Sequence, residues 1–66
     1  MAVAKVIELT AESGESFEDA IRAGIEKASE TIRNIKAAWV NGQQVVVEDG
    51  SIKAYRVDLK VTFVIE

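Results

Sequence analysis

The chain has 66 residues, of which 48% are hydrophobic and 29% charged, a formal net charge of −3, and neither cysteine nor histidine. This length and composition predict one globular domain over residues 1–66 rather than a disordered chain. Disulfides and Cys/His metal sites are excluded, so a bound metal would be a hard cation such as calcium, held by oxygen ligands. The acidic balance, without a basic run, argues against nucleic-acid binding.

The chain also lacks the residue types that most often act as a catalytic base or nucleophile. With no histidine, no cysteine and no convincing pairing of carboxylates, we expect a protein that is not an enzyme. No apolar run reaches the roughly 18 residues of a transmembrane helix. The segment from Met1 to Lys5 has neither the basic start nor the apolar core of a signal peptide. We therefore expect a cytoplasmic protein without a membrane partner, and oligomerisation, because so small a domain is marginally stable alone.

The first part of the chain predicts a strand, a loop and the start of a helix. Ala2–Leu9 is rich in valine and isoleucine and predicts a strand. Thr10–Ser16 is polar and predicts a loop. Ser16 suits a helix N-cap, because its hydroxyl can accept a hydrogen bond from the backbone N–H of Asp19.

The helix itself is indicated by an apolar stripe at helical spacing. The stripe consists of Phe17, Ala20, Ile21, Gly24, Ile25, Ala28 and Ile32. Since Gly24 lies on this face, we expect the sheet to approach the helix closely there. The helix should end near Ile32 or Arg33, with Asn34 as its terminator.

Two further strands follow, joined by a hairpin. Ala37–Glu48 predicts a strand interrupted at Gly42, where a glycine indicates a bulge or a close backbone approach. The Glu48–Ser51 segment contains Asp-Gly, the strongest short signal for a hairpin turn. Ile52–Ile65 predicts the last strand, in which apolar and polar residues alternate from Tyr55 to Phe63.

The order strand-helix-strand-strand predicts an α+β fold in which a three-stranded antiparallel sheet packs on one helix. The last strand takes the central position, because the hairpin makes it antiparallel to both others. Its apolar side, with Val57, Leu59, Val61 and Phe63, should lie under the helix. Its other side, with Arg56, Asp58, Lys60 and Thr62, should remain uncovered. In the strand over Ala37–Glu48, Ala38 and Val40 suit the core, so Ala37 and Trp39 should share the uncovered face.

An exposed tryptophan on an uncovered sheet face indicates a contact surface. Trp39 is either a stacking platform for a ligand or an anchor in a subunit interface, and aromatic enrichment in interfaces favours the second. Arg56, beside it, would favour an anionic ligand group or form an ion pair. Asp58 and Lys60 suit ion pairs between subunits.

The remaining acidic residues have simple interpretations. Glu48 and Asp49 in the turn are interpreted as solvated residues rather than calcium ligands, because the spacing of a calcium-binding loop is absent. Glu12 and Glu15 are expected to be solvated loop residues. The residues of any metal site are not identified by the sequence.

Several segments, taken in order and spacing, resemble the dodecins. They are Lys5-Val6-Ile7-Glu8-Leu9, Ser16-Phe17-Glu18-Asp19-Ala20, Thr31-Ile32-Arg33-Asn34-Ile35, Glu48-Asp49-Gly50 and Tyr55-x-Val57-x-Leu59-Lys60-Val61-x-Phe63. The resemblance implies a single dodecin-like domain that assembles with itself into a hollow homododecameric shell. It also implies storage of a small ligand, in many members riboflavin or FMN, at subunit contacts.

The resemblance also marks two departures from the flavin-binding pattern. Ala37 stands where those members have a stacking tryptophan, and Arg56 stands where they have a glutamine that bonds the ring edge. Arginine only donates, so an acceptor is lost as well. The pattern is similar to the calcium dodecin branch. The candidate ligand site is therefore Ala37, Trp39 and Arg56, with Trp39 as a displaced stacking platform, and the alternative is a structural or calcium-binding shell without flavin.

Overall fold

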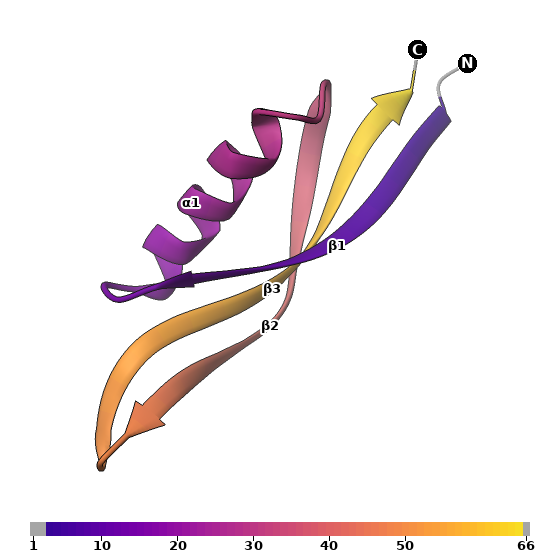
Figure 1. Cartoon of the computed structure of the whole chain (residues 1–66). Helices are drawn as coiled ribbons and strands as arrows, with labels where there is room; N and C mark the ends of the chain where they lie inside the picture. Colours follow the sequence, from indigo (N-terminus) through magenta and orange to yellow (C-terminus); the bar gives the residue numbers. More distant parts are fainter. Residues whose placement is uncertain (1–2, 66) are drawn as a thin grey trace.

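The computed structural model describes residues 3–65, which form a three-stranded sheet with one helix on one face (Figure 1). The elements are β1 (Val3–Ser13), α1 (Phe17–Ser29), β2 (Ile35–Glu48) and β3 (Ser51–Ile65). The strand order is β1-β3-β2, and both neighbours run antiparallel to the central strand. The predicted α+β class and the central position of the last strand are confirmed.

The first strand is longer than its sequence indicated. Ala2, where we expected it to begin, lies outside the described residues, and pairing with β3 continues as far as Ser13 opposite Tyr55. The prediction of a loop from Thr10 is therefore wrong for its first four residues, 10–13. These residues alternate in the period of a strand, because Ala11 packs against the core under α1 while its polar neighbours face the other side.

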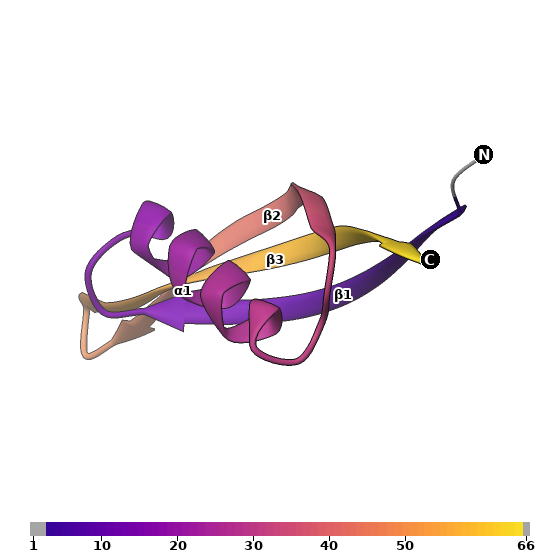
Figure 2. The ribbon, with the colours of Figure 1, turned by 90° about the horizontal axis from the view of Figure 1, so that it is seen from above.

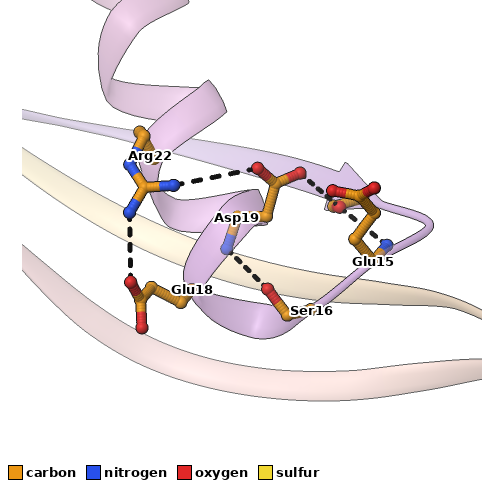
Figure 3. Close-up of polar contacts among 6 residues, drawn as sticks. Glu15, Ser16, Glu18, Asp19 and Arg22 are labelled. Carbon is orange, nitrogen blue, oxygen red and sulfur yellow. Dashed lines mark hydrogen bonds and ion pairs between the residues drawn. The ribbon is translucent and has the colours of Figure 1, made fainter.

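The start of the helix is fixed by hydrogen bonds that begin in β1. Ser16 is the N-cap, as predicted, and its Oγ accepts from the Asp19 amide at 2.9 Å (Figure 3). The buried Ser13 donates its hydroxyl to the Asp19 carboxylate at 2.6 Å and accepts from the Glu15 amide at 2.9 Å. One buried hydroxyl thus links the end of the strand to the first turn of the helix.

The helix ends earlier than predicted, at Ser29, with Glu30 as its C-cap. Helical hydrogen bonding nevertheless continues briefly, because the amide of Ile32 donates to the Ala28 carbonyl at 2.9 Å. Asn34 does not terminate the helix but lies in the connection to β2, with a left-handed φ of 62° that asparagine tolerates. With its 13 residues α1 is short, and no helix within residues 3–65 is long and apolar enough to cross a membrane.

The second strand and its hairpin follow the predicted irregularities. Strand β2 begins at Ile35, two residues earlier than expected, and its register with β3 shifts between Val40 and Gly42. The predicted bulge is therefore confirmed. Asp49 and Gly50 both have positive φ, 52° and 78°, as a two-residue hairpin turn of the primed type requires.

The core lies between α1 and the middle of the sheet (Figure 2). Its fully buried members are Ala20, Val57, Leu59 and Val61. Because α1 lies mainly against β1 and β3, the helix side of β2 is left largely uncovered. Ala38 and Val40 pair with core residues of β3, but both are exposed in the single chain, so their prediction as core is wrong at this level.

The chain is elongated for its length. It measures 51 × 19 × 14 Å, and its radius of gyration of 13.5 Å exceeds the value of about 11 Å expected for a compact domain of this size. The β2–β3 hairpin accounts for the extension, since its tip projects past the first turn of α1 (Figure 1). Near that tip Val47 and Ile52 are 60% and 55% exposed, so much apolar surface is left uncovered by this chain.

Substitution of Gly24 by alanine tests how closely the helix packs on the sheet. A Cβ at this position would lie 2.9 Å from the Ala11 Cβ. We expect Gly24→Ala to lower the free energy of unfolding by about 1–2 kcal/mol, because overpacking outweighs the gain in helix propensity. Urea unfolding at fixed protein concentration measures this, with Gly14→Ala as the control, since a Cβ there meets nothing within 4 Å. Equal stabilities of the two variants would contradict the close packing.

Candidate functional site

The face of the sheet opposite α1 is built from four rows of paired residues, which we call the open face. From the hairpin side toward the chain ends, the rows are Glu12–Arg56–Gln44, Thr10–Asp58–Gly42, Glu8–Lys60–Trp39 and Val6–Thr62–Ala37. Alternation along β3 directs these side chains away from the core, because the intervening residues are the buried ones. The open face is therefore the surface that the sequence indicated.

Trp39 is the largest exposed side chain of the open face. It is 70% exposed and lies opposite Lys60, while Ala37 lies opposite Thr62. The predicted position of both residues on this face is confirmed. An indole with this exposure offers a ring surface for stacking or for burial against another molecule.

Arg56 lies farther from Trp39 than the sequence suggested. The partner of Trp39 on β3 is Lys60, and four residues along a strand correspond to about 13 Å between that row and Arg56. The expectation that Arg56 lies beside the tryptophan is therefore wrong within one chain. The cationic neighbour of Trp39 is Lys60.

The guanidinium of Arg56 is held by Glu12. Its Nε and Nη2 donate to the Glu12 Oε1 at 3.0 and 2.8 Å, with side chains 39% and 49% exposed. Glu12 is exposed, as expected, but its prediction as a loop residue is wrong, because it belongs to β1 and pairs with Arg56. The missed signal was the alternation through Thr10 and Glu12, which places both on the open face.

Asp58 lies in the row between those of Trp39 and Arg56, and its side chain is oriented by a hydrogen bond. The Thr10 hydroxyl donates to its Oδ1 at 3.1 Å. Its Oδ2 lies 3.9 Å from the point where a Cβ on Gly42 would stand. The second carboxylate oxygen is therefore directed toward β2. Ion pairing of Asp58 and Lys60 between subunits stays a prediction.

Two of the open hollows in the surface of residues 3–65 lie beside α1 and the connection that follows it. One lies between α1 and the outer edge of β1, near Leu9, Gly24 and Ile32, and the other lies where the helix connection meets the end of β3. Neither hollow is lined by Ala37, Trp39 or Arg56. A ligand on the predicted site would thus be contacted by a single chain from one side only.

The acidic turn does not form a chelating cluster. Glu48 pairs with Lys53 at 2.9 Å. Over residues 3–65, no group of three or more acidic residues lies close enough together to hold a metal ion.

The fold and the open face define a class of small α+β proteins in which a helix covers one side of a three-stranded sheet and leaves the other side free. The chain belongs to the dodecin family, whose model matches residues 3–66. The search of curated proteins found no match.

Solved dodecin structures are similar over nearly the whole chain. A variant of the Thermus thermophilus dodecin is 32% identical, with a TM-score of 0.94 over 100% of this chain and 98% of that one. The dodecin from Streptomyces davaonensis is 31% identical, with a TM-score of 0.94 over 98% and 96%. The calcium dodecin from Mycobacterium tuberculosis, described as having a novel calcium-binding site, is 30% identical, with a TM-score of 0.86 over 97% and 91%.

The Glu12–Arg56 pair has a testable energetic signature. Because both side chains are partly exposed, Glu12→Gln should lower the free energy of unfolding by less than about 1 kcal/mol. The difference should shrink at high salt, since exposed charges are screened. Urea unfolding at low and high salt measures both effects, and Glu18→Gln, which removes the exposed pair with Arg22 on the helix, is the matched control. A loss above about 2 kcal/mol would contradict this expectation and indicate a desolvated pair.

Proposed function

We propose that this chain is a non-enzymatic, small-ligand-binding protein that works as a dodecameric assembly and binds its ligand between subunits at the open face. The observation that carries the proposal is the 70% exposure of Trp39 on the free side of a dodecin fold. A flat aromatic molecule can stack on that indole. A second subunit would supply the opposite wall that one chain lacks.

The need for assembly is supported by the shape of the single chain. The chain is elongated and its apolar hairpin projects from the rest. As a result, few side chains are fully buried in the core. Domains of this size without disulfides or metals commonly gain stability from oligomerisation. Sedimentation velocity of the purified protein should therefore give a single dodecameric species at micromolar concentration, and a monomer or dimer would contradict the proposal.

The ligand site we propose consists of Ala37, Trp39 and Arg56, in unequal roles. Trp39 is the stacking platform, displaced by two residues from Ala37, which presents only a methyl group. Glu12 engages the Nε and Nη2 of Arg56, so the remaining N–H donors of the guanidinium are the ones that would reach a ligand. Flavins such as riboflavin and FMN are the first compounds to test, because they combine a planar ring with an exposed edge.

Trp39→Ala tests this site directly. We expect wild-type protein to quench the fluorescence of added riboflavin and the variant to lose at least about tenfold in affinity, since aromatic stacking contributes roughly 1 kcal/mol beyond area burial. Trp39→Phe, which keeps a ring, should retain most of the binding and serves as the control. Unchanged affinity in the alanine variant would reject Trp39 as the platform.

A second candidate function is calcium binding, favoured by the similarity to the Mycobacterium tuberculosis calcium dodecin. The open face carries three carboxylates, Glu8, Glu12 and Asp58, and repetition by symmetry would multiply them. If the assembly binds calcium, millimolar calcium should raise the melting temperature at constant ionic strength, because a ligand of the native state stabilises it. Magnesium at the same concentration is the control, and no shift with calcium would reject this candidate.

A further inference from the structure

The open face contains a gap beside Trp39. The bulge between Val40 and Gly42 places Trp39 and Gly42 in neighbouring rows of the same face, opposite Lys60 and Asp58. Gly42 has no side chain to fill its row. Since a Cβ there would lie 3.9 Å from the Asp58 Oδ2, the missing side chain leaves that oxygen open on the β2 side.

The Asp58 carboxylate is oriented toward this gap. Its Oδ1 accepts a hydrogen bond from the Thr10 hydroxyl on the β1 side at 3.1 Å, and its Oδ2 faces Gly42, which lies in the same row on β2. Of the cations on the two neighbouring rows, Arg56 is bound by Glu12 and Lys60 lies opposite Trp39. An acceptor is therefore presented next to an exposed aromatic platform.

We propose that Asp58 accepts a hydrogen bond from the edge of a planar heteroaromatic ligand that stacks on Trp39. This inference rests on the proposed function and names the chemistry of the same site: the ligand carries a ring N–H that points along the sheet toward Asp58. The row of Asp58 is two residues from that of Trp39, about 7 Å along the strand, a distance that a fused ring system spans.

A carboxylate at the ring edge selects ligands that carry a hydrogen-bond donor there. An ionised carboxylate only accepts, whereas the guanidinium of Arg56 only donates. A ring with an imide or similar N–H edge thus satisfies Asp58, while a ring with only acceptors or a methylated nitrogen leaves the carboxylate unpaired. Asp58, rather than Arg56, then takes the role of recognising the ring edge.

The experiment compares riboflavin with N3-methylriboflavin, which keeps the ring but lacks the N–H, by fluorescence titration of the full-length assembled protein. In the wild type, methylation should weaken binding by about tenfold to a hundredfold, the range for a hydrogen bond to a charged group. In Asp58→Ala the two ligands should bind equally. Glu26→Ala, which removes one negative charge from the exposed side of α1, should keep the wild-type difference.

Each outcome decides the inference. The predicted pattern supports it. Equal affinities of the wild-type protein for the two flavins overturn the inference. An affinity difference that persists in Asp58→Ala overturns it as well. In both cases, loss of riboflavin binding in Trp39→Ala leaves the proposed stacking site in place. Failure of both flavins to bind the wild-type assembly overturns this inference and the flavin form of the proposed function together.

Discussion

The contact of α1 with β1 and β3 determines which side of the sheet is free. Gly24 allows the helix backbone to approach Ala11 so closely that even one methyl group would meet its Cβ at 2.9 Å. The helix therefore covers the apolar side of the central strand, with Leu59 beneath it. Because side chains alternate along a strand, the same contact leaves every second residue of β3 on the open face.

The helix is too short and too displaced to cover the whole sheet. It leaves the helix side of β2 and the long hairpin with exposed apolar residues such as Val40 and Ile52. In the assembly that we propose, this remaining apolar surface is buried against other copies of the chain. The proposed function thus links ligand binding to assembly, because the open face of one chain supplies one wall of the proposed site.

Charge on the open face is organised by rows rather than by sequence neighbours. Arg56 is one of the two departures that the resemblance to the dodecins marks, yet in three dimensions it is held by Glu12 from the edge strand β1. Trp39 is paired instead with Lys60, and Asp58 lies next to the gap at Gly42. The bulge in β2 produces this arrangement, since one extra residue brings Trp39 and Gly42 to the same face.

The sequence alone determined the α+β class, the central position of β3, the Ser16 cap, the bulge at Gly42 and the face on which Ala37 and Trp39 lie. These features depend on local rules of periodicity, capping and turn chemistry. Only the tertiary structure decided that residues 10–13 continue β1, that Val40 is left uncovered and that Glu12 engages Arg56. The reason is that register between strands distant in sequence, and the position of a helix over a sheet, are set by packing of the whole chain and not by any one segment.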